Sequence, residues 1–238
     1  MSQPDLQNMT DQPNTWHMLR AMGGVGILCA VLIVFTFQAT LPAIETNKAA
    51  ALEKAIFAVI PGASTKIAFK LNENKQFEEV EKAEKGVRVV YAGYNDQNEL
   101  VGVAIEANGQ GFQDIIRVIY GYSPESQAII GFQVLESKET PGLGDKIEKD
   151  EHFLQNFDGL DISVTDDQNA IKNPIVPVKK GEKVNPWEID CITGATISSK
   201  AVANLLRNNT GELIPLLVQN IETLKKAKTA TDLSAVQH

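Results

Sequence analysis

The chain has 238 residues and a formal net charge of −8, from 22 lysine and arginine residues against 30 aspartate and glutamate residues. No block of Lys and Arg interrupts this acidic balance, which argues against a nucleic-acid partner. With 43% hydrophobic and 22% charged residues, the composition is that of a globular protein that can build a core.

An uncharged apolar run at residues 22–41 dominates the N-terminal part. About 20 residues at roughly 1.5 Å each reach across the hydrocarbon core of a bilayer. A removable signal peptide is the alternative, but the preceding segment is long, the apolar run exceeds a usual h-region, and no clear A-x-A site follows. We expect a polar, disordered tail at residues 1–15 and a retained transmembrane anchor at residues 16–41.

Arg20 at the N-terminal edge of the anchor predicts the orientation, because positive charges favour the cytoplasmic side. The tail would then be cytoplasmic. In a bacterium, the anchor would cross the inner membrane once and the large C-terminal part would lie in the periplasm. Helical spacing of apolar residues predicts a connecting helix within residues 42–62, which Pro61-Gly62 ends.

The body, residues 63–238, is expected to be one domain of the α+β class with mainly antiparallel strands and C-terminal helices. Residues 72–86 are charged and predict a solvated connector. Runs rich in Val, Ile and Tyr predict four strands, residues 87–94, 99–107, 114–122 and 128–137. A short helix is expected at residues 150–157, an irregular segment at 173–187, and helices at 197–207 and 213–226.

Small hydroxyl residues gather in residues 190–202, just before the first C-terminal helix. Thr193-Gly194 suits a tight turn, and Thr196 stands where a helix N-cap would be. One interpretation is therefore a helix cap and nothing else. The other uses the same geometry, since the free N–H groups and dipole of a helix start favour a phosphate.

These residues resemble a known motif. Asp190, Thr193-Gly194-Ala195-Thr196 and Ser198 are similar to the D-x-x-[ST]-G-A-T-x-[ST] flavinylation motif of the membrane-anchored FMN-binding domain family. The stretch ESKETPGLGDKIE, residues 136–148, resembles a loop in the G subunits of Rnf-type ion-translocating electron-transport complexes. The resemblance extends over about residues 16–227, with the anchor, this loop and the motif in matching order.

The resemblance implies that FMN is joined through its phosphate to Thr196 by a separate flavin transferase. Thr193, Gly194, Ala195 and Ser198 would surround that phosphate, and Glu139, Thr140, Leu143 and Gly144 would line the ring end of the flavin. From the residues alone, Pro141-Gly142 indicates a type II turn at the surface. No metal site is expected, because no second His or Cys lies at ligand spacing. Cys191 departs from the Ala or Gly expected in the family.

The function implied is that of an electron-carrying subunit in a membrane complex that couples electron transfer to ion translocation. Its partners would be the other membrane subunits, and it would not be active alone. One alternative is the equivalent C subunit of a Na⁺-translocating NADH:quinone reductase. Another, of a different class, is a membrane-anchored binding or assembly module without flavin.

Overall fold

The computed structural model of the chain describes residues 15–80 and 87–226. Nearly all of the predicted polar tail lies outside these residues, as does part of the predicted charged connector. The chain forms two compact units, residues 1–50 and residues 51–238, and each is described by itself.

The first unit is dominated by helix α1, Thr15–Val59, whose last turns belong to the second unit. The predicted anchor and connecting helix are one continuous element, which runs through Pro42 and ends at Val59. Large apolar side chains are exposed along it, among them Val25, Ile33 and Phe35 at 62%, 68% and 70%. A helix that is apolar on all sides without protein cover fits a lipid environment. Among the described residues, α1 is the one helix long and apolar enough to cross a membrane, consistent with a single-pass anchor.

The two threonine hydroxyls inside the apolar stretch are satisfied by the helix itself. The Thr36 hydroxyl donates to the Leu32 carbonyl at 2.8 Å, and the Thr40 hydroxyl donates to the Thr36 carbonyl at 2.9 Å. Because a bilayer core offers no water as a partner, such internal bonds remove the cost of these hydroxyls in lipid.

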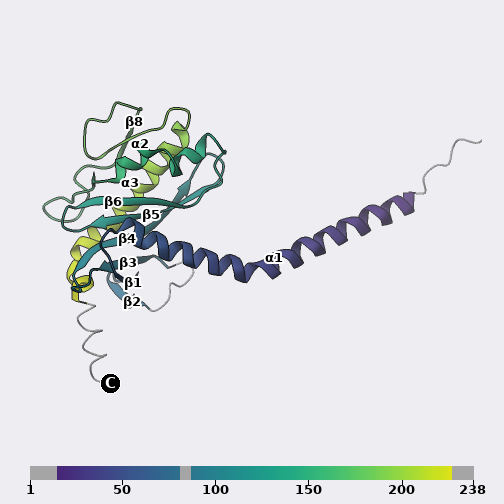
Figure 1. The fold of residues 1–238 in the computed structure, drawn as a ribbon, viewed down its shortest axis with the longest axis horizontal. Coiled ribbons are helices and arrows are strands. Elements are labelled where there is room, and N and C mark those ends of the chain that lie inside the picture. Colours follow the sequence, from purple (N-terminus) through teal and green to yellow (C-terminus); the bar gives the residue numbers. More distant parts are fainter. Residues whose placement is uncertain (1–14, 81–86, 227–238) are drawn as a thin grey trace, which may run out of the picture. The chain divides into compact units, whose positions relative to one another are not determined.

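The second unit is built on a seven-stranded antiparallel sheet with strand order β2-β1-β3-β4-β5-β6-β7 (Figure 1). The expected α+β class with antiparallel strands is confirmed, and so are the four predicted strands, with small shifts at their ends. The seven strands are β1 Thr65–Leu71, β2 Phe77–Val80, β3 Val89–Tyr94, β4 Leu100–Gln110, β5 Ile115–Ser123, β6 Ala128–Glu136 and β7 Leu160–Asp161.

Strands β1 and β2 were not predicted. The prediction of a solvated connector was wrong for Phe77–Val80, which pairs with β1 in register, Leu71 opposite Phe77. The sequence did contain a signal for β1, because Ile67, Phe69 and Leu71 are spaced two residues apart, as on one face of a strand. In β2 the two glutamates are exposed while Phe77 is buried, so the charge of the segment concealed the strand.

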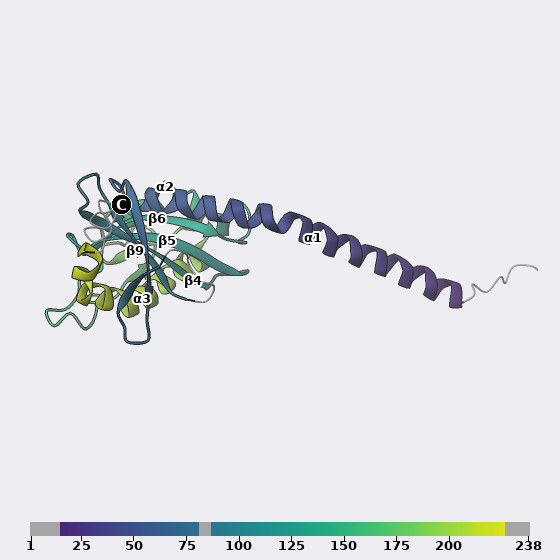
Figure 2. The same cartoon turned by 90° about the horizontal axis from the view of Figure 1, so that it is seen from below.

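Each face of the sheet is covered by a helix (Figure 2). On one face, the last turns of α1 bury Ala55, Ile56 and Val59 against β3, β4 and β5. On the other, helix α3, Thr196–Gln219, packs Val202, Leu206 and other residues of its apolar face into the larger core. The two layers hold the strands between them, which makes the sheet a firm support for the loops at its ends.

The C-terminal helical region differs from the prediction of two helices at 197–207 and 213–226. Helix α3 continues through Gly211 and Pro215, and the turn comes at Asn220, before helical residues 221–226. Burial of Leu213 and Leu217 in the same core as Leu206 outweighs the poor helix propensity of Gly and Pro.

The segment between β6 and the second, smaller sheet is compact. It contains the 3₁₀ helix η1 Gly144–Glu148, the expected short helix α2 Glu151–Leu154 and the 3₁₀ helix η2 Gln155–Phe157. Residues 173–187 are not wholly irregular, since β8 Val176–Val178 pairs in parallel with β9 Glu188–Asp190. A three-residue strand that contains a proline carries no usable sequence signal.

Two glycines set how closely α1 approaches the sheet. Gly121 of β5 and Gly131 of β6 are cross-strand partners, and both lie against the backbone of Val59. A Cβ at Gly121 would stand 1.8 Å from the Val59 carbonyl oxygen, and one at Gly131 would stand 2.6 Å from it. The backbone at the end of α1 therefore packs directly against the backbone of β5 and β6.

We expect Gly121→Ala to lower the free energy of unfolding of the second unit by about 3 kcal/mol, because α1 must move off the sheet to admit one methyl group. The measurement is a urea titration of the full-length chain in detergent, followed by circular dichroism.

Gly211→Ala is the matched control. Gly211 is exposed inside α3, and apart from its chain neighbours and the nearby backbone of α3 no heavy atom of the described residues lies within 4 Å of the position a Cβ would take. Alanine there should raise the stability by about 0.5–1 kcal/mol. If the two variants unfolded at the same urea concentration, the close contact at Gly121 would have no energetic weight.

Candidate functional site

The turn before α3 has the predicted form. The Ala195 N–H donates to the Ile192 carbonyl at 3.1 Å, and Gly194 has a φ of +84°. A side chain at this φ would be strained, so the turn requires glycine. Apart from Gly194 and its two chain neighbours, no heavy atom of the described residues lies within 4 Å of the place of a Cβ at Gly194, so the approach to the helix start is open.

Thr196 is not the N-cap of α3, contrary to the prediction. It is the first residue of the helix, the cap position belongs to Ala195, and no side chain caps the helix. The Thr196 hydroxyl donates to the Ile192 carbonyl at 3.3 Å and thus satisfies no N–H group. Thr196 is exposed, beside first-turn N–H groups that have no partner within the helix and at the positive end of its dipole.

The neighbouring hydroxyls have different environments. Thr193 is exposed, whereas Ser198 is 3% exposed and Ser199 is fully buried. The Ser199 hydroxyl donates to the Ala195 carbonyl at 2.8 Å and accepts from the Ile192 N–H at 3.1 Å. Ser199 therefore braces the turn from inside, while the Ser198 hydroxyl donates to Glu139.

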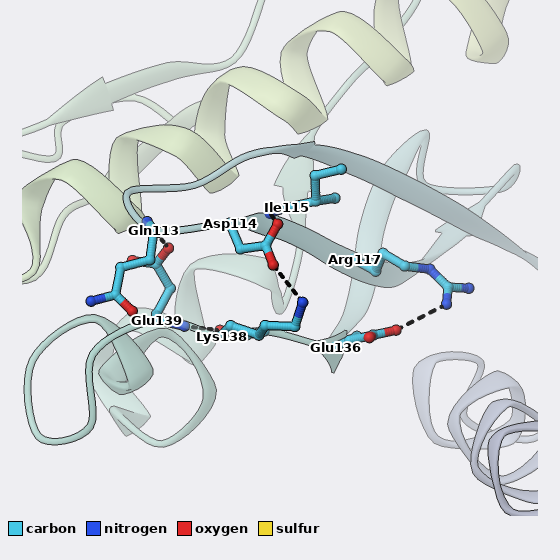
Figure 3. Close-up of polar contacts among 8 residues, drawn as sticks. Gln113, Asp114, Ile115, Arg117, Glu136, Lys138 and Glu139 are labelled. Carbon is cyan, nitrogen blue, oxygen red and sulfur yellow. Dashed lines mark hydrogen bonds and ion pairs between the residues drawn. The ribbon is translucent and has the colours of Figure 1, made fainter. Parts of the chain in front are cut away.

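Glu139 joins three segments of the chain that are far apart in sequence. It is only 5% exposed. Its Oε1 atom accepts the backbone N–H group of Phe112 at 2.8 Å. It also accepts the backbone N–H group of Gln113 at 3.0 Å, which Figure 3 shows. Its Oε2 atom accepts the Ser198 hydroxyl. One carboxylate thus connects the β4–β5 loop, its own loop after β6 and the first turn of α3.

Two glycines make room for this carboxylate. A Cβ at Gly111 would stand 2.5 Å from Glu139 Oε1, and a Cβ at Gly144 would stand 2.7 Å from Glu139 Oε2 and 3.0 Å from Ser198 Oγ. Any larger residue at either position would displace the carboxylate from its partners.

The loop after Glu139 forms the predicted type II turn. The Leu143 N–H donates to the Thr140 carbonyl at 3.1 Å, and Gly142 has a φ of +79°. The Thr140 hydroxyl accepts from the Gln113 side-chain amide at 2.8 Å, which adds a second tie to the β4–β5 loop. The β4–β5 loop is also held by an ion pair, in which Lys138 Nζ lies 2.5 Å from Asp114 Oδ2 (Figure 3). The hydrogen bond from Lys138 lowers the pKa of the Asp114 carboxyl.

Exposed apolar side chains gather on the three joined segments. Phe112 lies in the β4–β5 loop and Ile115 is the first residue of β5. Leu143 lies in the type II turn and Ile197 in the first turn of α3. The four side chains are 50–60% exposed. Phe112, Ile115 and Ile197 were not predicted as site residues. The sequence offered a signal for Ile197, because it directly follows Thr196.

The hydrogen bond of Ser198 with Glu139 thus joins the two predicted segments, residues 139–144 and 193–198. Within them, Leu143, Thr193, Gly194 and Thr196 are exposed. Two residues within the motif, Asp190 and Cys191, have other environments. The Asp190 carboxylate accepts the Gly181 N–H at 2.7 and 2.8 Å. Cys191 is 2% exposed, and burial raises the pKa of its thiol, so it is a protonated core group at neutral pH.

A cavity of 620 Å³ lies further along α3, against the start of β3 and the end of β4. Asn108, Asn204 and Asn208 are among its lining residues, and none of the predicted site residues is. It is therefore separate from the centre at Glu139.

Comparison with known proteins places the site in a family. Residues 111–210 match the model of the FMN-binding domain. The match begins at Gly111 and ends inside α3, and so includes all three segments that Glu139 connects.

Similar proteins extend the relationship beyond this domain. The chain is 28% identical over 200 residues to the G subunit of the ion-translocating oxidoreductase complex of Methanosarcina acetivorans, covering 84% of this chain and 95% of that protein. It is 33% identical over 125 residues to the protein of the same name from Escherichia coli K12, covering 52% of this chain and 55% of that one.

Two solved structures share the fold. Shewanella oneidensis NqrC aligns with a TM-score of 0.56 at 16% identity, over 78% of this chain and 99% of that one. The C subunit of the Na⁺-translocating NADH-quinone reductase from Parabacteroides distasonis aligns with a TM-score of 0.55 at 24% identity, over 72% of this chain and 94% of that one. Residues 111–210 are therefore similar to the FMN-binding domain family, and most of the chain is similar to the G subunits of ion-translocating oxidoreductase complexes.

Proposed function

We propose that this chain is an electron-carrying subunit of a membrane complex that couples electron transfer to ion translocation, with FMN attached through its phosphate to Thr196. The observation that carries the proposal is the exposed Thr196 hydroxyl in the first turn of a 24-residue helix that no side chain caps. The match to an FMN-binding domain supports the identity of the group.

The residues fit an FMN phosphate. Gly194 leaves the approach open, and the first-turn N–H groups of α3 offer hydrogen bonds to phosphate oxygens. Thr193 and Ala195 border that position, and Ser198 and Glu139 hold it from beneath. When bound, the flavin supplies the electron-transfer chemistry, and the protein supplies position, hydrogen bonds and exclusion of water.

The exposed apolar side chains supply a surface for the flavin ring. Leu143, Phe112 and Ile197 stand on the joined segments, where a flat apolar ring would cover them. Thr140 and Gly144 would also line the ring end of the flavin. A covalent link keeps the group in place while leaving the ring free to accept and donate electrons.

The setting of the proposed electron carrier follows from α1. Arg20 before the apolar stretch favours a cytoplasmic N-terminus and, in a bacterium, a periplasmic flavin domain on the inner membrane. Its partners would be the other membrane subunits of the complex, with a flavin transferase for maturation. The named relatives favour a G subunit over the alternative of a C subunit, since the likeness to the two solved structures concerns the fold.

We expect Thr196→Val to abolish flavin attachment while changing the free energy of unfolding by less than about 0.5 kcal/mol, because its hydroxyl makes only one 3.3 Å bond at the surface. The full-length chain would be co-expressed with a flavin transferase and examined by intact mass and by flavin fluorescence in a denaturing gel.

The unmodified parent chain is the reference, and a second substrate confirms that the transferase is active. Fluorescence that persists in Thr196→Val would move the attachment to another residue. A parent chain without added mass would favour the remaining alternative, an anchored module without flavin.

Leu143→Ser should leave the flavin attached but expose its ring to solvent, because an apolar side chain that is 53% exposed would no longer cover it. The expected result is stronger quenching of flavin fluorescence by iodide. Val184→Ser is the matched control, since Val184 is an exposed apolar residue, 86%, in another loop. Equal quenching in both variants would contradict a ring position beside Leu143.

A further inference from the structure

Four hydroxyl residues stand within seven positions of each other, Thr193, Thr196, Ser198 and Ser199, and all four are alcohols of similar reactivity. Chemistry alone does not distinguish them as acceptors. The structure divides them into two pairs, because Thr193 and Thr196 are exposed whereas both serines are buried and bonded. Ser199 is held by the backbone of its own turn. Ser198 is held by a residue 59 positions away.

We propose that Glu139 is a positioning residue that directs flavin attachment to Thr196, by binding the Ser198 hydroxyl and fixing the first turn of α3. This inference rests on the proposed function. Thr196 and Ser198 are two residues apart on the first turn, so a rotation of that turn that freed Ser198 would also move Thr196. The carboxylate resists such a rotation because its Oε1 atom is itself anchored by the Phe112 and Gln113 N–H groups.

The surroundings of Glu139 support a fixed position rather than an accidental contact. Gly111 and Gly144 enclose the two carboxylate oxygens so closely that neither could carry a Cβ. Thr140, the next residue, is tied to Gln113 as well. A buried carboxylate is costly unless its oxygens are hydrogen-bonded, so the three donors and the acceptor hold each other in place.

The reaction that this arrangement would direct is a phosphoryl transfer. The Thr196 oxygen forms a new bond to the phosphorus of the flavin phosphate. The phosphoanhydride bond of a flavin dinucleotide, the co-substrate, breaks and leaves its electron pair on the departing nucleoside monophosphate, which takes up the hydroxyl proton. Glu139 touches none of these atoms and acts only through the position of the helix turn.

Glu139→Gln tests the role because it keeps the volume and changes one bond. The amide oxygen can still accept the Phe112 and Gln113 N–H groups, but the amide nitrogen is a donor, so the charge-assisted bond from the Ser198 hydroxyl is replaced by a weaker neutral bond of the opposite direction. The full-length chain would be co-expressed with the transferase. The rate of labelling would be followed over time, and the labelled residue would be found by peptide mapping.

We expect labelling of Thr196 in Glu139→Gln to be about tenfold slower, since a small displacement of a reacting group is costly, and we expect part of the label on Ser198. Ser198→Ala should slow labelling of Thr196 in the same way, without a second labelled residue. The double variant should be no slower than the slower single variant, because both changes act on the same interaction.

Glu188→Gln is the matched control. Glu188 Oε2 also accepts two consecutive backbone N–H groups, those of Val184 at 2.7 Å and Asn185 at 2.9 Å, and no hydrogen bond joins it to α3 among the described residues. The Glu188→Gln variant should be labelled on Thr196 at the same rate as the parent chain. Labelling of Thr196 alone, at the parent rate, in Glu139→Gln would overturn the positioning role while leaving the proposed function intact. A parent chain that takes no label would overturn both.

Discussion

One buried carboxylate determines the shape of the candidate site. Glu139 accepts hydrogen bonds from the β4–β5 loop and from the first turn of α3, and it lies itself in the loop after β6. Because a buried carboxylate must keep its hydrogen-bond partners, these three segments cannot move independently. The segments that carry the open helix start, the type II turn and the exposed apolar side chains are therefore held in fixed positions relative to one another.

The sheet and its two covering helices make this surface firm. Helix α3 is held along most of its length by the larger core, so the position of its first turn is fixed from behind as well as by Glu139. On the other face, α1 reaches the sheet at Gly121 and Gly131 without intervening side chains. A site placed on such elements holds a bound group more precisely than one on free loops.

The hydroxyls around the turn illustrate how environment assigns roles to similar side chains. Ser199 and Ser198 are buried and brace the turn and the helix, while Thr196 is exposed beside the first-turn N–H groups. The cap interpretation of Thr196 is wrong because the preceding turn places Ala195 at the cap. Without a capping side chain, the positive end of the helix is open to an anion such as a phosphate.

Local pattern in the sequence determined the apolar helix, the four central strands, both glycine turns and the order of motifs that indicated an FMN-binding domain. These features depend on composition, periodicity and backbone freedom, which neighbouring residues decide. Tertiary structure alone decided that α3 continues through Gly211 and Pro215 and that Phe77–Val80 is a strand, since burial there outweighs propensity and charge. It also decided the link between Glu139 and Ser198, because residues 59 positions apart meet only when the sheet and α3 are packed.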